Sequence, residues 1–189
     1  MRRPASPSNM AEPAWQRLGH SRPAGMSAAM WSWIADQGSL TRRLKAASGG
    51  AFEVRLRQQG WGRALPTELR LLGVGARGKA LVREVELLCR GVPWVYARTV
   101  IPARSLAGAA RRLGHLGTHS LGAVLFASPA TRRCAMEYAR LSPAQPLYAA
   151  AAVALPEPRP PSLWGRRTLF RYAGKPLLVN EIFLPALPL

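Results

Sequence analysis

Two charged residues stand alone among apolar neighbours in this chain, and their types suit them to bind a small acid. Arg83 lies in ALVREVELLC (residues 80–89), where the other odd-numbered positions are all apolar, and Glu181 is the only charge on the odd-numbered positions of LLVNEIFL (residues 177–184). An arginine can hold a carboxylate through two parallel hydrogen bonds, and a carboxylate can accept a hydrogen bond from a hydroxyl. Because an unpaired buried charge is costly, the pattern predicts either a closed pocket for a small hydroxylated acid or an ion pair between the two residues in the core.

Alternating apolar and polar residues predict the strands that carry these two charges. The segment FEVRLRQ (residues 52–58) alternates as in a sheet with one solvated face. Residues 80–89 reach a second strand at residues 94–101 through the turn RGVP. Residues 167–173 reach residues 177–184 through the turn GKP in the same way. The sequence therefore predicts two hairpins of one antiparallel sheet, with both charges on its apolar face.

Helix start signals appear at several places between the strands. Residues 26–37 have a helical pattern, and Ser39 and Ser105 each precede a further helical segment. Residues 128–141 open with a Ser-Pro pair, which fits a cap and the first helical position. We therefore expect an α+β fold, in which helices pack on one face of a single antiparallel sheet.

The length of 189 residues fits one domain with a single core. Residues 1–25 are rich in Pro, Ser, Gly and Arg without periodicity, which predicts a flexible arm in which only Trp15 and Leu18 can dock. Residues 141–162 contain six prolines and resemble an inserted loop, although their AAAAVA run fits a short strand or a helix equally well. The domain itself is expected to span residues 26–189.

The charge balance favours an anionic partner without identifying it. There are 27 Lys and Arg residues against 9 Asp and Glu residues, a formal net charge of +18. Such a charge suits nucleic acid, an anionic membrane or a small acid. Almost all of the basic residues are arginines, and alanine is abundant too, a bias that a GC-rich genome can produce without selection for binding. Neither a basic amphipathic helix nor aromatic residues interleaved with arginine stand out, so we expect no nucleic-acid binding.

The sequence gives little support for a metal-binding protein, a disulfide-stabilised fold or a membrane-spanning protein. Cys89 and Cys134 lie far apart, and the three histidines form no metal-binding cluster. The chain has no apolar leader and no uninterrupted run of about 18 apolar residues. We therefore expect a soluble cytoplasmic protein without stable membrane insertion.

Four segments resemble the chorismate pyruvate-lyase family of bacteria. They read SLTRRL, VREVELLCRGVPWVYARTVIP, LGTHSLGAVLF and LWGRRTLFRYAGKPLLVNEIFLPALPL, and they follow one another in the family's order. The resemblance covers roughly residues 26–140 and 162–189. It implies conversion of chorismate to 4-hydroxybenzoate and pyruvate, the first committed step of ubiquinone biosynthesis. It also implies a monomer without cofactor or metal, whose pocket lies under helical flaps.

The resemblance also implies roles for individual residues. It places the ligand-binding arginine on Arg83, as the anchor of a carboxylate, and the glutamate on Glu181, as the partner of the ring hydroxyl. It adds Leu40 and Leu121 as backbone contacts, which is physically reasonable because each follows a serine at a helix start, where N–H groups are free to meet an anion. The residues alone favour ordinary core positions for both leucines, and only the resemblance indicates a place in the site. GRR (residues 165–167), like Arg42 and Arg43, could steer a dianionic substrate, but the residues favour a solvated basic face for each.

Two other classes of function remain open at this point. Ligand-sensing domains of bacterial transcription regulators share this type of fold and would bind an effector without turnover. The arm over residues 1–25 has no winged-helix pattern, which argues against that class. A basic protein associated with RNA or membranes is the other class.

Overall fold

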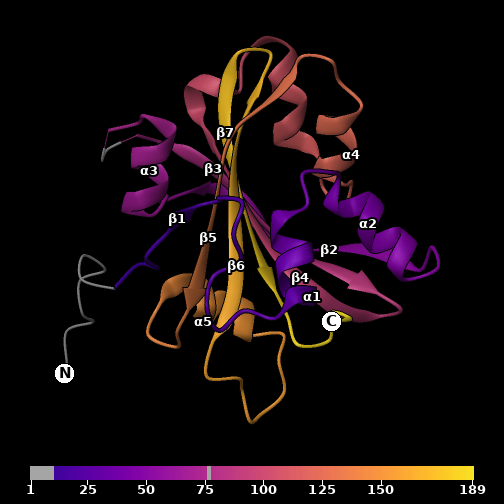
Figure 1. Ribbon diagram of the computed structural model, residues 1–189. Helices are drawn as coiled ribbons and strands as arrows, with labels where there is room; N and C mark the ends of the chain where they lie inside the picture. The colour runs from indigo at the N-terminus through magenta and orange to yellow at the C-terminus, as the bar shows by residue number, and fades with distance from the viewer. Residues whose placement is uncertain (1–10, 76–77) are drawn as a thin grey trace, which may run out of the picture.

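The computed structural model describes residues 11–75 and 78–189, and its centre is one seven-stranded sheet (Figure 1). The strand order is β1-β5-β6-β7-β4-β3-β2, and every neighbouring pair is antiparallel. The single antiparallel sheet of the predicted α+β fold is therefore confirmed. The strands are β1 (Gln16–Arg17), β2 (Phe52–Gly62), β3 (Ala80–Cys89), β4 (Val92–Pro102), β5 (Thr131–Leu141), β6 (Leu163–Tyr172) and β7 (Lys175–Phe183).

Short helices cover both faces of this sheet, and α2 and α4 lie on one side while α3 lies on the other (Figure 1). None of the helices in the described residues is long and apolar enough to cross a membrane. The α-helices are α1 (Ala28–Ala35), α2 (Leu40–Ala47), α3 (Pro66–Leu72), α4 (Leu121–Phe126) and α5 (Pro146–Ala152), and the 3₁₀ helices are η2 (Ala103–Ser105) and η3 (Gly108–His115).

The core lies mainly between the sheet and α1, α2, η3 and α4. Ile34 of α1 and Leu44 of α2 are fully buried against β3 and β4, and Leu113 of η3 and Leu125 of α4 are buried further along the same face. Ser27, Ser39 and Ser120 cap α1, α2 and α4, and the sequence predicts a helix start at the last two of these serines. The odd-numbered apolar positions of β3 face this layer, so the same face presents Arg83 to the helices.

Residues 131–141 form strand β5, so the helix predicted over residues 128–141 is wrong. β5 pairs with β6 along its whole length, from Thr131 opposite Tyr172 to Leu141 opposite Leu163. Ser128 accepts a hydrogen bond from the amide of Ala130 in a turn before the strand and does not begin a helix. The residues of this segment tolerate both conformations, and pairing with a neighbouring strand outweighs their moderate helix propensity.

Part of the Pro-rich stretch 141–162 belongs to the core. Its AAAA run lies in α5, the helix among the alternatives that the sequence left open, and Pro146 occupies the first turn. Tyr148 and Ala151 are buried against Tyr96 and Ile182 on the second face of the sheet. The interpretation as an inserted loop holds only for the exposed residues on either side of α5.

Residues 12–18 also pack on the domain, whereas residues 1–10 of the predicted arm lie outside the described residues. β1 pairs with β5, and Glu12 accepts a hydrogen bond from the amide of Thr67 at 3.0 Å. Trp15 and Leu18 both contact core clusters, and the ring of Trp15 lies 4.5 Å from the guanidinium of Arg167. The prediction of a flexible arm therefore does not describe residues 12–18.

Candidate active site

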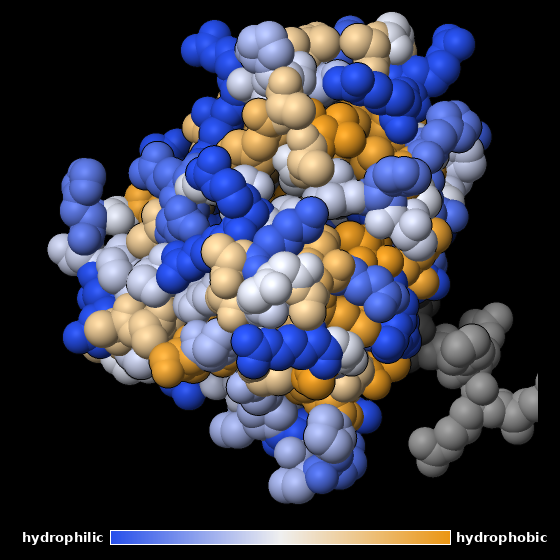
Figure 2. Space-filling model, turned by 90° about the vertical axis from the view of Figure 1, so that its right-hand side faces the viewer, coloured by the Kyte–Doolittle hydropathy of each residue, from blue (hydrophilic) through white to orange (hydrophobic). Residues whose placement is uncertain are grey.

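A cavity lies between the sheet and the start of helices α2 and α4, and its walls include all four residues predicted for the site. It contains about 600 Å³ of unfilled space, part of which opens to solvent. Figure 2 views the molecule from this side, where apolar residues show between hydrophilic side chains. Leu40 and Leu121 come from the two helices, and Arg83 and Glu181 come from the sheet. Thus residues up to 141 positions apart in the sequence line one pocket.

Arg83 is a buried cation whose charge no described residue neutralises. Its side chain projects from β3, and the residue is 2% exposed. Nε and Nη2 donate to the carbonyl of Gly117 at 3.3 and 2.8 Å, and Nη2 also donates to the carbonyl of His119 at 2.9 Å. Burial lowers the pKa of the guanidinium to about 10, so it remains charged at neutral pH. The carbonyls hold the side chain in place, and Nη1 keeps its donors for a ligand in the pocket.

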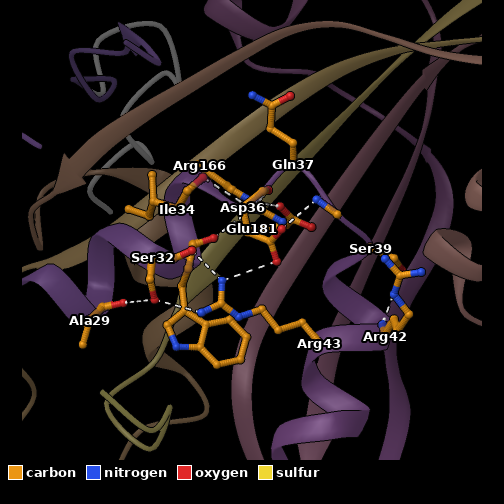
Figure 3. Close-up of polar contacts among 12 residues, drawn as sticks. Ala29, Ser32, Ile34, Asp36, Gln37, Ser39, Arg42, Arg43, Arg166 and Glu181 are labelled. Carbon is orange, nitrogen blue, oxygen red and sulfur yellow. Dashed lines mark hydrogen bonds and ion pairs between the residues drawn. The ribbon is translucent and has the colours of Figure 1, made fainter. Parts of the chain in front are cut away.

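Glu181 forms its ion pair with Arg166, so the predicted alternative of an Arg83–Glu181 pair is wrong. Arg166 lies directly opposite Glu181 in β6, and its Nε donates to the Glu181 carboxylate (Figure 3). Nη1 of Arg166 donates to the carbonyl of Trp33 at 2.9 Å and to that of Asp36 at 2.8 Å. These carbonyls lie at the C-terminal end of α1, where helix carbonyls lack partners within the helix. Arg166 therefore fixes both the end of α1 and the orientation of the Glu181 carboxylate.

The start of α2 meets the start of α4 at the mouth of the pocket. The hydroxyl groups of Thr41 and Ser120 are hydrogen-bonded at 2.8 Å. A Cβ at Gly122 would lie only 2.7 Å from Oγ1 of Thr41, so glycine permits this close approach. Because the first N–H groups of a helix have no carbonyl partner within it, the amides of Leu40 and Leu121 are suited to meet an anion here.

Sequence reasoning did not single out Arg133, and it considered Arg166 only within GRR and not as part of the pocket wall. Arg166 and its neighbour Arg167 are both buried, so the interpretation of GRR as a solvated basic face is wrong for them. The alternation of residues in β6 could have placed Arg166 in the pocket, because Arg166, Thr168 and Phe170 share the pocket face. The predicted strand begins only at residue 167, so Arg166 falls outside this alternation.

Arg42 and Arg43 differ from each other in their surroundings. Arg42 is exposed, whereas Arg43 pairs with Asp36 at 3.3 Å and lies 3.9 Å from the ring centre of Trp33 (Figure 3). Arg43 therefore ties α2 to the end of α1, and the solvated basic face does not describe it. Among the residues that the structure describes, there is no group of three or more His, Cys, Asp or Glu side chains that could hold a metal ion.

Solved structures with a similar fold come from ligand-binding domains of transcription regulators. The effector domain of PhnF from Mycobacterium smegmatis matches with a TM-score of 0.57 and 21% sequence identity, covering 79% of this chain and 90% of that one. The ligand-binding domain of a GntR-family regulator from Bordetella bronchiseptica matches with a TM-score of 0.52 and 17% identity, covering 71% and 85%. These likenesses show the fold, an α+β domain, and in this chain that fold encloses a cavity between the sheet and the helices.

Comparison with known sequences shows which family of proteins the chain resembles. The sequence model of the family described as "Chorismate lyase" matches residues 11–188. A "probable chorismate pyruvate-lyase" from Methylococcus capsulatus is 48% identical over 157 residues, which cover 83% of this chain and 95% of that protein. A protein of the same name from Azoarcus is 43% identical and covers 82% and 83%. The chain belongs to the chorismate lyase family.

Proposed function

We propose that this protein converts chorismate to 4-hydroxybenzoate and pyruvate, as the first committed step of ubiquinone biosynthesis, and acts as a cytoplasmic monomer without cofactor. The family supports the reaction, and one observation of the structure carries the proposal. The pocket contains a buried, uncompensated arginine, Arg83, together with a carboxylate, Glu181, that an ion pair holds in position. A small acid that also carries a hydroxyl group satisfies both residues.

The reaction needs little more than a well-oriented substrate. The bond between the ring and the ether oxygen of the enolpyruvyl group breaks, and the ring carbon that bears the hydroxyl loses its hydrogen as a proton. The electrons of that C–H bond complete the aromatic ring, and the released enolpyruvate takes up a proton to become pyruvate. Because aromatisation makes the step strongly downhill, orientation and preorganised charges suffice without a covalent nucleophile.

The proposed roles follow from the positions of the groups around the cavity. Arg83 and the amides of Leu40 and Leu121 hold the ring carboxylate, since they are donors that no carboxylate of the described residues occupies. Glu181 accepts a hydrogen bond from the ring hydroxyl, at the carbon that loses its proton. Buried apolar residues such as Val85 line the rest of the pocket and keep water away from the charged groups.

Turnover of chorismate distinguishes this proposal from a sensor domain with the same fold. Purified protein is incubated with chorismate, and both 4-hydroxybenzoate and pyruvate are quantified by chromatography. We expect the two products in equal amounts, over many turnovers, and with the same rate after exhaustive treatment with a chelator. A protein that is stabilised by 4-hydroxybenzoate but leaves chorismate intact would be a sensor, and a rate that only added metal restores would contradict the cofactor-free reaction.

A further inference from the structure

Arg133 reaches the cavity because of an irregularity in β5. The register with β6 shifts between Arg133, opposite Phe170, and Ala135, opposite Leu169, so Cys134 is an extra residue in the strand. Residues directly opposite each other in an antiparallel pair point to the same face. Phe170 lines the cavity, and the bulge therefore turns Arg133 to the pocket face, where regular alternation would place Cys134.

The guanidinium of Arg133 is held by the protein but retains unused donors. Nη1 donates to the carbonyl of Gln37, and Nη2 donates to the carbonyl of Gly38 at 3.3 Å. The rings of Phe126 and Phe170 lie 5.4 and 5.5 Å from its central carbon. Nε is buried and has no hydrogen-bond partner among residues 11–75 and 78–189. A buried donor in this state is costly unless a ligand or water accepts from it.

The charges on the cavity wall do not cancel. Its charged side chains, within the described parts of the chain, are Arg83, Arg133, Arg166 and Glu181. The ion pair between Arg166 and Glu181 is neutral as a unit, so the other two arginines leave two positive charges. Burial lowers the pKa of Arg133, and the nearby Arg166 lowers it further, while Glu181 and Asp36 raise it. The pocket therefore suits a ligand with two negative charges better than a ligand with one.

We propose that Arg133 binds a second carboxylate of the substrate, the one on the enolpyruvyl side chain, an inference that rests on the proposed function. Across the sheet the order is Arg83 on β3, then β4, Glu181 on β7, Arg166 on β6 and Arg133 on β5. Chorismate offers one group to each of Arg83, Glu181 and Arg133. Its ring carboxylate lies at one end, its hydroxyl at the other, and the side chain with the second carboxylate is attached next to the hydroxyl.

This assignment makes Arg133 specific for substrate over product. Once the ether bond breaks, the second carboxylate leaves with pyruvate, and 4-hydroxybenzoate retains only the carboxylate held by Arg83. Arg133 should therefore contribute to chorismate binding and not to product binding. A residue that only supported the fold of the pocket would affect both ligands alike.

The test compares Arg133→Gln with Arg132→Gln, a matched control at an exposed neighbour on the same strand. Steady-state kinetics give KM for chorismate, and calorimetry gives Kd for 4-hydroxybenzoate. Because charged hydrogen bonds are lost, we expect Arg133→Gln to raise KM by about tenfold or more and to change Kd by less than about twofold. Arg132→Gln should change neither. An unchanged KM, or equal losses for both ligands, would overturn the proposal.

A pair of stable ligands tests Arg133 independently of turnover. The probe 3-(carboxymethoxy)-4-hydroxybenzoate carries two carboxylates, and 4-hydroxy-3-methoxybenzoate carries one. Wild type should bind the first more tightly, Arg133→Gln should lose this preference, and Arg133→Lys should keep part of it. Equal affinities in wild type would refute the inference without any variant. If wild type shows the preference yet leaves chorismate intact, the proposed function fails, and Arg133 remains the site of a second carboxylate in a ligand that is not turned over.

Discussion

Glu181 forms an ion pair with Arg166 and also lines the cavity. Glu181→Gln keeps an acceptor for Arg166 but removes the counter-charge, while the carbonyls at the end of α1 remain in place. We therefore expect the variant to lose about 1–3 kcal/mol of stability, less than the 3–5 kcal/mol that roughly applies when a buried charge loses every partner. Binding of 4-hydroxybenzoate should weaken by about tenfold or more, because the ring hydroxyl loses a charged acceptor.

Melting curves of wild type and Glu181→Gln, each with and without 4-hydroxybenzoate, separate these effects. The variant should melt moderately lower without ligand and gain much less from ligand than wild type does. A variant that melts far lower but responds fully to 4-hydroxybenzoate would show that Glu181 serves only the fold.

Arg83 is expected to act through the planar shape of its guanidinium as well as its charge. Arg83→Lys keeps the charge but loses the fork of donors, so binding of 4-hydroxybenzoate should weaken by about 1–3 kcal/mol. Arg83→Ala should nearly abolish turnover. The matched control is Arg167→Lys, since Arg167 is also buried but pairs with Glu137 at 2.6 Å and does not line this cavity. Calorimetry should find affinity reduced only in the Arg83 variants, and full activity in Arg83→Ala would remove Arg83 from the site.

At the scale of elements, α5 belongs to the fold, while the segment after it tolerates change. Deleting residues 146–152 would expose the apolar surface that Tyr148 and Ala151 cover, so we expect an insoluble chain. Replacing the exposed residues 156–159 with a Gly-Ser linker of equal length should leave activity and melting temperature close to wild type. Soluble expression and chorismate turnover measure both outcomes. A soluble, active chain without α5 would restore the interpretation as an inserted loop.

The elements also explain which site residues could be predicted from sequence. Arg83 and Glu181 lie in strands with regular alternation, where one charge among apolar residues is easily recognised. Arg133 could not be recognised in this way, because the sequence of its segment resembles a helix. Its alternation also breaks at Cys134, and only the pairing with β6 reveals this break. For Leu40, a backbone contact leaves no mark on side-chain type, so only family resemblance could indicate it.

At the scale of the whole molecule, some of the many arginines lie inside the protein, where they form ion pairs. The 9 acidic residues are too few to neutralise 27 basic ones, yet several that pair with arginines are buried or partly buried. One such network joins Arg98 to Glu68 at 3.1 Å and to Glu84 at 2.5 Å, on the face of the sheet opposite the cavity. The remaining charge favours approach of a small dianion and does not require a nucleic-acid partner.

The central claim is that the pocket recognises a hydroxylated ring acid from both ends, and a crystal structure with 4-hydroxybenzoate bound tests it most directly. We expect the carboxylate within about 2.7–3.2 Å of the Arg83 guanidinium and of the amides of Leu40 and Leu121, with the hydroxyl donating to Glu181. Arg133 should make no contact with this product. A ring bound outside the cavity, or with its carboxylate on Arg133 or Arg166, would contradict the account.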